Sequence, residues 1–574
     1  HDRDYVCAFA VALGRAGGEA RALAGARARV GAAMMKLATP DEMRQIDRAA
    51  AEDYGVSGLA LMENAGAAVA RVAFRVAAQA ARTELCCRGG QTRPVSVCIL
   101  TGRGNNGGDG FAAARHLAGY GARVSVYVVG EPSAVSGDAR TNLDAMVKSG
   151  IGLVPLLSEA AWNAARADLV ASDVIIDAVL GTGARGAPSP EAARAISLMN
   201  ESPAPIVAVD VPSGVDALTG AVFGECVNAR VTVTLALAKT GLLTYPGASC
   251  VGRVVLDGIG MPPALLESSG IKAHLTTPDD VRAALPVRRP DAHKGDSGRV
   301  LIVAGSLGMS GAPSLAAMGA LRSGAGLVHL SVPAVIAGEV SARHAEVMTH
   351  PAPEEDLPAI LEMAATCQAV VVGPGMSCCE RTSGIVDAMI AELRVPLVLD
   401  ADAVNVLAGR AQALRQAKAP VVLTPHPGEL GRLLGVGPDE INRDRLGWAR
   451  RAALETGATV VLKGARTVIA DETGQAYVNP TGNSGMATAG MGDVLAGVVG
   501  SLCAAGLSGL AAGYCSAYIH GLAGDFAARE RGLDGMVAGD VLAHIPESFR
   551  AARTKTAMLW AMMPVTHAHM PEGW

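Results

Sequence analysis

Ten short apolar runs, most of them followed by glycine or by a polar cluster, constrain the fold of this chain more than any other feature. Helix-length spacers separate most of them, a pattern typical of strands that lie parallel in a sheet with helices on both faces. The runs fall into two groups, so we predict an α/β protein with two sheets. They are residues 94–100, 123–129, 174–176, 206–211 and 231–236, then 300–304, 369–372, 397–399, 421–423 and 459–462.

The length of the chain also predicts more than one domain. A chain of 574 residues exceeds a single core, and 69 glycines with 3% aromatic residues favour Ala/Val/Leu packing with many turns. Proline-rich residues 262–292 lie between the two groups of runs. We predict an upstream extension (1–33), a first domain (34–262), a linker (263–292), a second domain (293–553) and an unassigned tail (554–574).

Charge and composition exclude several classes of protein. A net charge of -5 gives no electrostatic basis for binding nucleic acid. Residues 494–524 lack Asp, Glu, Lys and Arg, but seven glycines interrupt them, so we expect two buried, closely packed helices and no membrane span. The 11 cysteines are scattered, as in reduced buried thiols. Without an apolar leader at the N-terminus, we expect a cytoplasmic protein that naturally starts near Met34.

Residues 483–497 (NSGMATAGMGDVLAG) carry the strongest chemical signal. Gly490 and Gly492 allow several backbone N–H groups to point into one anion-binding concavity. An apolar run from Val494 predicts a helix whose positive end faces the same point. Asp493 lies beside that concavity and can take a proton from a hydroxyl, which predicts phosphoryl transfer to a hydroxyl. The alternative is an aspartate that merely caps the helix.

A second group of candidates follows the strands of the first half. Residues 102–109 (GRGNNGGD) contain the Gly102, Gly104 and Gly107 spacing of a dinucleotide-binding turn, before a helix predicted at 110–119. The asparagines and aspartate there, with a serine hydroxyl, also suit a hard monovalent cation beside a phosphate-bearing ligand. A metal-free Rossmann dehydrogenase remains the alternative.

The motifs of both halves resemble one known family in a single order over residues 35–553. The second half resembles the ADP-dependent hydro-lyase that repairs hydrated nicotinamide cofactors, a member of the ribokinase-like superfamily, and the first half resembles its partner epimerase. Met491 stands where threonine is commoner. The matching segments are 61–66 (LMENAG), 105–109 (NNGGD), 177–183, 210–214 (DVPSG), 293–298 (HKGDSG), 311–313, 373–375 (GPG), 399–402 (LDAD), 424–429 (TPHPGE), 463–464 and 490–493 (GMGD).

The resemblance implies a fold and two activities. The first domain would be a Rossmann-like three-layer α/β/α epimerase domain, and the second a ribokinase-like α/β/α dehydratase domain. The first would interconvert the R and S hydrates of NADH and NADPH. The second would dehydrate the S form with ADP, giving the reduced cofactor, AMP and phosphate.

For the dehydratase half, the resemblance implies one catalytic base, Asp493, with Gly490 to Gly492 as the anion hole. For His426 the alternative is a plain turn residue between two prolines. The hydrated cofactor would contact Ala312, Gly375, His426 and Asp493, and the nucleotide would contact Lys463, Gly464, Ala465, Arg466, Thr467 and Gly492.

For the epimerase half, the resemblance implies Asp210 as the catalytic carboxylate; the alternative is a capping aspartate before Pro212. Lys239 is either a phosphate contact or a solvated lysine. Potassium would be held by Asn106, Asp177 and Ser213. The hydrate would contact Asn105, Asn106, Gly107, Gly108, Asp109, Gly181, Thr182, Gly183, Ala184, Arg185, Gly186, Ala187 and Asp210.

The resemblance further implies magnesium with ADP in the second domain, small-molecule substrates, no nucleic-acid or membrane partner, and a homo-oligomer. Two other classes of protein fit part of the pattern. A small-molecule kinase of the ribokinase-like group would use the same Asp493 but would leave the first domain unexplained. A non-catalytic nucleotide-binding scaffold would use the first half to recruit a partner.

Overall fold

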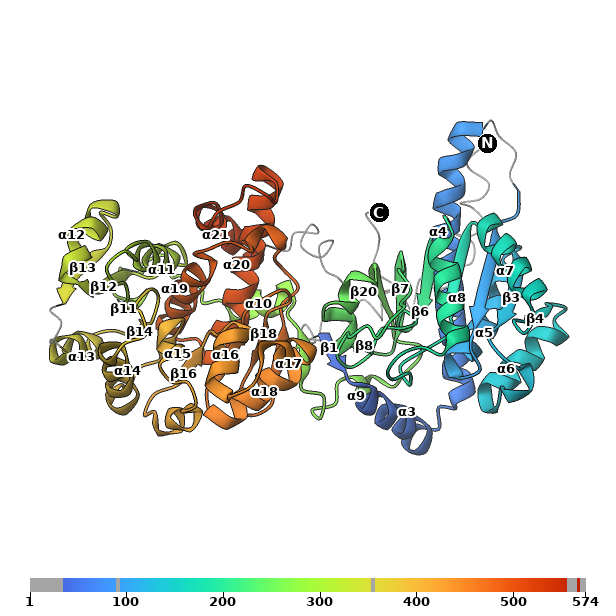
Figure 1. Cartoon of the computed structure of the whole chain (residues 1–574), viewed down its shortest axis with the longest axis horizontal. Helices are drawn as coiled ribbons and strands as arrows, with labels where there is room; N and C mark the ends of the chain where they lie inside the picture. The colour runs from blue at the N-terminus through green and yellow to red at the C-terminus, as the bar shows by residue number, and fades with distance from the viewer. Residues whose placement is uncertain (1–34, 89–92, 353–356, 555–564, 568–574) are drawn as a thin grey trace.

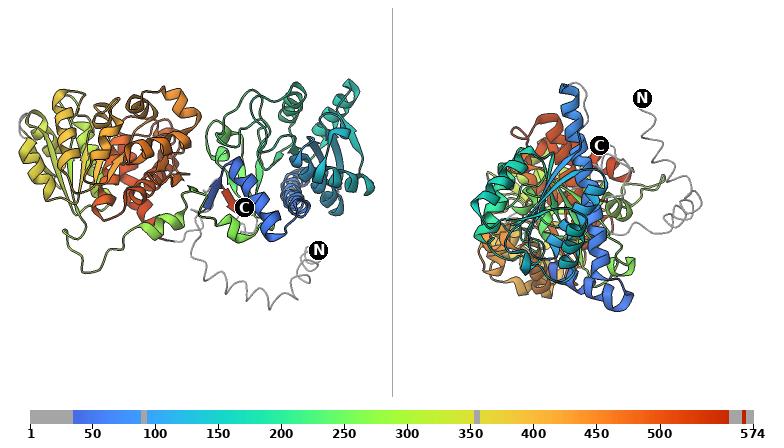
Figure 2. Two further views of the ribbon diagram at one scale, coloured as in Figure 1. Left: turned by 90° about the horizontal axis from the view of Figure 1, so that it is seen from below. Right: turned by 90° about the vertical axis from the view of Figure 1, so that its right-hand side faces the viewer.

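The computed structural model describes residues 35–88, 93–352, 357–554 and 565–567. It consists of two α/β units that lie side by side along the long axis, each with helices on both faces of a sheet (Figure 1). The left view of Figure 2 shows the same division from below. The predicted α/β class is confirmed. The predicted extension 1–33 lies outside the described residues.

The first unit contains an eight-stranded sheet in which every pair of neighbours is parallel. All five apolar runs predicted before residue 262 are strands of this sheet. Because the strands are parallel, their carboxyl ends share one edge, where the candidate loops begin. In spatial order the strands are β20 (Val565–His567), β9 (Arg253–Asp257), β7 (Val231–Leu235), β6 (Ile206–Val209), β5 (Val174–Ala178), β2 (Ser96–Thr101), β3 (Arg123–Val128) and β4 (Leu153–Pro155).

Two apolar cores flank this sheet. One lies under α4, α5 and α6, and the other under α7 and α8. A further helix, α3, follows a strand that belongs to the other sheet. The helices are α3 (Pro40–Tyr54), α4 (Gly58–Arg88), α5 (Asn105–Gly119), α6 (Gly137–Lys148), α7 (Glu159–Ala171) and α8 (Pro190–Glu201).

The second unit is built on a 12-stranded sheet. Its first seven strands are parallel and include all five runs predicted after residue 292; β17–β18 and β18–β19 are antiparallel. In spatial order the strands are β13 (Met348–Ala352), β12 (Leu327–Pro333), β11 (Arg299–Val303), β14 (Ala369–Val372), β15 (Leu397–Leu399), β16 (Val421–Leu423), β17 (Thr459–Leu462), β18 (Val468–Ala470), β19 (Ala476–Val478), β10 (Ala273–Leu275), β1 (Met35–Ala38) and β8 (Ala238–Lys239).

Helices also cover both faces of the second sheet, with one apolar core on each face. Residues 494–524 lie in α19 and α20, two packed helices with mostly buried residues, as predicted. In the part of the chain that the structure describes, we find no helix that could span a membrane. The principal helices are α10 (Pro278–Ala284), α11 (Gly311–Arg322), α12 (Ala334–Arg343), α13 (Leu357–Ala365), α14 (Glu380–Glu392), α15 (Asp402–Asn405), α16 (Pro427–Leu434), α17 (Pro438–Arg443), α18 (Arg445–Thr456), α19 (Met491–Ala504), α20 (Gly509–Arg531) and α21 (Ala538–Arg553).

Three short strands join the two units. After β7 the chain leaves the first sheet and forms β8, which runs parallel to β1. Strand β1 pairs with β10, and β10 pairs with β19. The second sheet therefore continues into residues 35–38 and 238–239 of the first half. The segment 263–292, expected as a linker, contributes β10 and α10 to the second unit.

Two further differences concern the tail and the cysteines. Residues 565–567, within the tail left unassigned, form β20 at the edge of the first sheet beside β9. Cys98, Cys367, Cys503 and Cys515 are buried free thiols as expected, whereas the adjacent pair Cys378 and Cys379 is exposed.

Candidate active sites

The first turn of α19 forms the anion-binding feature of the second unit. Gly490 adopts a left-handed conformation (φ 87°) and precedes the helix, which begins at Met491. The helix starts three residues earlier than predicted, so Gly492 and Asp493 lie in its first turn. The N–H groups there have no partner within the helix and point outward. Asp493 follows the N-cap by three residues and makes no cap hydrogen bond, so the capping alternative is wrong.

Lys463 lies against this turn and is surrounded by carboxylates. Its Nζ is 2.6 Å from Asp400 Oδ1 and 3.6 Å from Glu429 Oε2. A Cβ added at Gly492 would stand 3.2 Å from the same Nζ, so the ammonium group borders the nest. Thr424 Oγ1 also donates to Asp400 Oδ1, at 2.7 Å. The ends of β15, β16 and β17 thus place one cation and two buried carboxylates beside Asp493.

These charges prepare Asp493 for proton transfer. Burial raises the pKa of Asp493 to about 7, and repulsion from Asp400 and Glu429 adds to the effect, whereas Lys463 opposes it. No hydrogen bond to its carboxylate is present in the part of the chain that the structure describes. A carboxyl group with a pKa near neutrality can both accept and release a proton at physiological pH.

Two of the three residues expected beside Asp493 in the hydrate pocket meet. Gly375 has a φ of 65°, and a Cβ added there would stand 3.0 Å from the Cβ of Ala312. His426 caps α16 instead: its Nδ1 accepts from the N–H of Gly428 at 3.0 Å, and its Nε2 lies 3.3 Å from Glu429 Oε1. The predicted turn role is therefore observed for His426, and its half-exposed ring leaves a ligand role as a proposal.

Hydrogen bonds from a buried arginine fix the start of the loop that begins at Lys463. Arg445, which the sequence analysis missed, is buried and donates to the carbonyls of Leu462 (3.0 Å) and Lys463 (2.9 Å). Burial lowers the pKa of Arg445 to about 10. Arg466 has a φ of 57° and donates to the carbonyl of Pro480. A non-glycine residue held at positive φ is characteristic of functional loops.

His520 on α20 was also missed. It is buried, and its Nε2 has no hydrogen-bond partner among the described residues. Burial, together with the nearby charge of Lys463, lowers the pKa of His520 to about 4, so the ring is neutral. The carbonyl of Met491, close enough to accept a hydrogen bond, opposes that shift. No sequence motif identified Arg445 or His520, because only the packing of α18 and α20 brings them to the site.

Replacing Gly490 with alanine tests the nest. An added Cβ would lie 2.5 Å from Leu315 Cδ1, and left-handed backbone costs a non-glycine residue about 1–2 kcal/mol. We expect Gly490→Ala to lower the free energy of unfolding by at least that amount, about 1–2 kcal/mol, and to weaken ADP binding. Denaturant unfolding and calorimetric titration measure both. Gly539→Ala is the matched control, since nothing lies within 4 Å of its added Cβ; equal stability and affinity in both variants would contradict the role of Gly490.

In the first unit, three predicted cation ligands converge at the ends of β2, β5 and β6. Asp177 is fully buried and accepts from Ser213 Oγ at 2.6 Å and from Ser213 N–H at 2.8 Å. Leu180 N–H donates to Ser213 Oγ at 2.8 Å, and Asn106 Nδ2 donates to Leu180 O at 2.9 Å. Burial raises the pKa of Asp177 to about 6, while its hydrogen bonds oppose the shift. Each of the three side chains carries an oxygen atom that can act as a ligand of a hard cation.

The NNGGD segment lies inside a helix. Helix α5 begins at Asn105, five residues before the predicted start, so Asn105 and Asn106 occupy its first turn. Close packing explains two of the glycines: a Cβ at Gly107 would stand 2.2 Å from Gly102 O, and one at Gly108 would stand 2.4 Å from Met62 Sδ. The helix N-terminus therefore lies directly against the strand end, where it can face an anionic ligand.

Asp210 and Lys239 form a buried ion pair beside this helix. Asp210 has a φ of 65° and accepts from Leu235 N–H at 3.1 Å. Lys239, only 2% exposed, donates to Asp210 and, at 2.8 Å, to the carbonyl of Leu235. Asp210 caps no helix, so the capping alternative for Asp210 is wrong. Lys239 is buried, so the alternative of a solvated lysine is wrong as well. Burial, to which the charge of Asp210 adds, raises the pKa of Asp109 well above its ordinary value.

The loop 181–187 borders this cluster. Gly181 lies against Asn106: a Cβ added at Gly181 would stand 3.0 Å from Asn106 Cβ. Arg185 is exposed, with Nη2 3.8 Å from Asp41 Oδ1. Thr182 to Ala187 form a largely exposed loop with no element of their own. They are open to solvent at the same sheet edge as Asp210, where a ligand can reach both.

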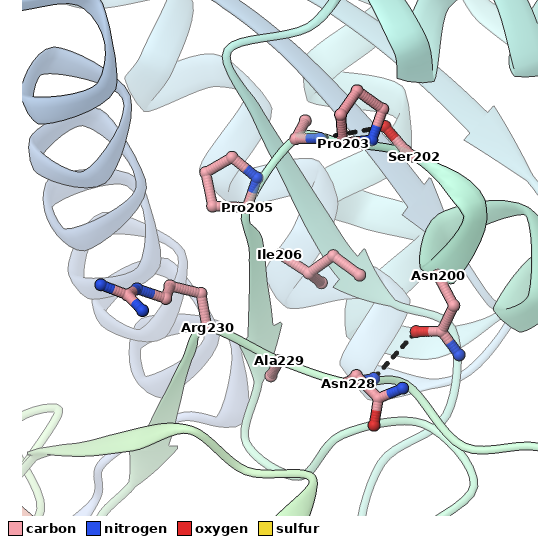
Figure 3. Close-up of a pocket in the computed structure, with 9 residues that line it drawn as sticks. Asn200, Ser202, Pro203, Pro205, Ile206, Asn228, Ala229 and Arg230 are labelled. Carbon is pink, nitrogen blue, oxygen red and sulfur yellow. Dashed lines mark hydrogen bonds between the residues drawn. The ribbon is translucent and has the colours of Figure 1, made fainter. Parts of the chain in front are cut away.

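A separate hollow of about 400 Å³ lies at the opposite edge of the first sheet (Figure 3). It is lined by residues around the start of β6 and β7, including Asn200, Ser202, Asn228 and Arg230. Asn228 N–H donates to Asn200 Oδ1 at 2.9 Å. Since the candidate residues follow the carboxyl ends of the strands, this hollow is not part of either site.

Both halves match known families. Residues 300–547 match the family described as NAD(P)H-hydrate dehydratase, and residues 58–241 match the YjeF-related protein N-terminus. The "Bifunctional NAD(P)H-hydrate repair enzyme Nnr" of Moorella thermoacetica is 43% identical over 90% of this chain and 97% of its own length. The protein of the same name from Escherichia coli is 35% identical over 87% of this chain and 91% of its own.

A solved structure is also similar to part of this chain. The ADP/ATP-dependent NAD(P)H-hydrate dehydratase of Bacillus subtilis, co-crystallized with ATP and Mg²⁺, is 31% identical. The alignment covers 48% of this chain and 98% of that one, with a TM-score of 0.44.

Proposed function

The chain belongs to the family of bifunctional NAD(P)H-hydrate repair enzymes, and from this premise we propose that it interconverts the R and S hydrates of NADH and NADPH and dehydrates the S form. The observation that carries the proposal is the half-buried Asp493 carboxyl in the first turn of α19, beside Lys463 and the left-handed Gly490. The match over both halves favours this function over a lone small-molecule kinase, which would leave residues 58–241 unexplained.

Dehydration needs a better leaving group than hydroxide. The hydrate carries a hydroxyl at C6 of its ring, and transfer of a phosphoryl group to that hydroxyl turns it into a phosphate ester. Phosphate then leaves C6 while C5 loses a proton, and the C5–C6 ring double bond re-forms. Asp493 would take the hydroxyl proton as the C6 oxygen attacks the phosphorus. The N–H groups of Gly490 to Gly492 and the Lys463 ammonium would stabilise the charge that develops on the phosphoryl oxygens. The donor proposed is ADP, which gives AMP.

The nucleotide would lie over Lys463 to Thr467 and Gly492, and the hydrated ring against Ala312, Gly375 and His426. Magnesium with ADP fits the oxygen donors around Lys463, since Asp400 and Glu429 are carboxylates and magnesium is usually bound through one or two carboxylates plus phosphate oxygens. When bound, it would neutralise phosphate charge.

In the first unit, Asp210 would move the proton of the C6 hydroxyl during ring opening and reclosure. Lys239 would fix the position of the Asp210 carboxylate through their buried ion pair. The hydrate would contact Asn105 to Asp109 and Gly181 to Ala187. Potassium fits the oxygen cluster of Asn106, Asp177 and Ser213, where a buried carboxylate with a raised pKa would gain from a cation. When bound, it would order the Leu180 loop.

The test is incubation of a mixed-epimer hydrate sample with the purified full chain and ADP. Reduced-nicotinamide absorbance should recover completely, with one AMP and one phosphate formed per molecule repaired. A parallel reaction with ATP compares the two donors. No recovery with either nucleotide would reject the proposal, and a stable phosphorylated product would instead indicate a kinase.

A further inference from the structure

Two cysteines of the first unit bring their sulfur atoms together. Cys226 Sγ donates a hydrogen bond to Cys250 Sγ at 3.2 Å. Cys250 is 8% exposed and directly follows the short helix η3 (Gly247–Ser249), whereas Cys226 is half-buried in the loop before β7. Both are free thiols, 24 residues apart in the sequence, and no sequence motif predicted their contact. The fold therefore creates a dithiol that a single two-electron oxidation can join.

The hollow described above borders this pair. Asn200 and Ala229 line the hollow (Figure 3). Asn200 Nδ2 donates to the carbonyl of Cys226 at 2.8 Å. Ala229 N–H donates to the carbonyl of Cys250, also at 2.8 Å. On the other flank Ser249 is exposed, and its Oγ lies 3.8 Å from Cys250 Sγ. A small molecule in the solvent therefore comes within one residue of each thiol.

The contact between the two sulfur atoms also favours a thiolate. The S–H group of Cys226 stabilises a negative charge on the Cys250 sulfur, which lowers the pKa of Cys250. The thiolate, and not the thiol, is the form that attacks an oxidant. By contrast, burial raises the pKa of the core thiol Cys503 to about 12. The paired cysteines therefore differ from that core thiol in reactivity as well as in position.

Direct packing connects the pair to Ser213, one of the predicted cation ligands. Val227, next to Cys226 in the chain, donates its N–H to the carbonyl of Ser213 at 2.9 Å. A Cβ added at Gly214 would stand 2.8 Å from Cys226 Cα, so the cysteine backbone packs on the residue after Ser213. Ser213 Oγ in turn donates to Asp177 at 2.6 Å. A displacement of Cys226 is therefore transmitted to the oxygen cluster at the strand ends.

We propose that Cys226 and Cys250 form a peroxide-oxidisable site whose disulfide slows the R-to-S interconversion. One sulfur, as a thiolate, attacks an oxygen of hydrogen peroxide and the O–O bond breaks. The departing hydroxide takes the proton that the thiol released, which gives water and a sulfenic acid. The second thiol attacks that sulfur, the S–O bond breaks, and the hydroxide leaves with the second thiol's proton as water. Two cysteines are oxidised and one peroxide is reduced; two molecules of a small thiol reverse the change and form their own disulfide.

The disulfide is expected to slow the reaction because a covalent S–S bond is shorter than the 3.2 Å contact. Closing it draws Cys226 toward η3, and the segment packed on Gly214 moves with it. The geometry of Ser213 beside Asp177 then changes. This effect on the rate rests on the proposed epimerase function, whereas formation of the disulfide does not.

The experiment treats the full chain with hydrogen peroxide, removes the excess and divides the sample. Mass spectrometry of a non-reduced digest should show the Cys226 peptide cross-linked to the Cys250 peptide, and dithiothreitol should remove the cross-link. Chromatography without nucleotide measures R-to-S conversion in the other portion. Conversion should fall by about fivefold or more, the range of ordinary coupling between two sites, and should recover with dithiothreitol.

Serine variants assign the effect to the pair. Reduced Cys226→Ser and Cys250→Ser should convert the epimers at close to the wild-type rate, and neither should lose that rate after peroxide treatment. Cys379→Ser, which removes an exposed thiol of the second unit, is the matched control and should stay as sensitive to peroxide as wild type.

Absence of the cross-link under peroxide treatment that oxidises Cys379 would overturn the site. A cross-link with an unchanged conversion rate would overturn its effect on the reaction. So would an equal loss of rate in both serine variants, because the oxidised group would then lie elsewhere. Reduced wild-type protein that does not interconvert the epimers would instead reject the epimerase function, and the cross-link would still decide whether the dithiol is oxidised.

Discussion

Asp493→Asn is expected to lower the rate of ADP-dependent dehydration by about 10²–10⁴-fold, because asparagine cannot take the hydroxyl proton. The fold should persist: no hydrogen bond to this carboxylate is present among the described residues, and the neutral amide also removes repulsion from Asp400 and Glu429. Steady-state recovery of reduced nicotinamide measures the rate, and calorimetric titration with ADP shows whether binding is kept. Turnover equal to wild type would reject Asp493 as the base.

The pH profile gives the same test without a mutation. Since the pKa of Asp493 is raised to about 7, the base form is present above that pH and is lost as pH falls through it. Dehydration should therefore be constant above about pH 8 and fall about tenfold per pH unit below pH 6. Asp534→Asn, at an exposed aspartate before α21, should leave the profile unchanged. A flat wild-type profile between pH 5 and 8 would contradict the assignment.

Asp210→Asn is expected to lower R-to-S conversion by about 10²–10⁴-fold while dehydration of purified S hydrate continues. A mixed-epimer sample should then lose its S portion quickly, and its R portion should follow only at the spontaneous rate. Asparagine is the appropriate replacement because it tolerates the left-handed backbone that Asp210 adopts at φ 65°. Rapid and complete repair of the mixture would contradict the catalytic role.

A second variant separates chemistry from stability. Asp210→Asn leaves the Lys239 charge buried without its partner, and breaking such a pair costs roughly 3–5 kcal/mol. Combining it with Lys239→Met removes the unpaired charge, so the double variant should unfold nearer to the wild-type midpoint. Its epimerase rate should remain as low as that of the single variant. Recovery of the rate in the double variant would mean that Asp210 acts only through stability.

The apolar runs predicted the parallel core of both sheets because buried parallel strands require continuous apolar sequence. They did not predict β1, β8 or β10, which are two to four residues long and read as ordinary loop or linker sequence. Their pairing depends on tertiary contacts between distant segments. Helices α5 and α19 both began earlier than predicted, since asparagine and glycine are poor helix formers and only the site explains their use there.

The candidate residues came from motifs in which glycine, asparagine and aspartate follow a strand, a signal that is local in the sequence. Arg445 and His520 carry no such signal, because each lies within a helix and reaches its site through the packing of that helix. The burial of Lys239 could not be predicted from the sequence either, since a lysine at the end of an apolar strand is as often solvated as paired. What remained hidden was the electrostatic surroundings of each motif.

The sheet that runs from β19 through β10 and β1 to β8 has a consequence for dissecting the protein. A fragment of residues 293–553 would lack β10. The N–H and C=O groups of β19 that pair with β10 would then form an open edge. Removing the second half would likewise free one side of β10. Open edges recruit strands from other molecules, so each isolated half would be prone to self-association. Single-site inactivation within the intact chain is therefore the sound way to study one activity without the other.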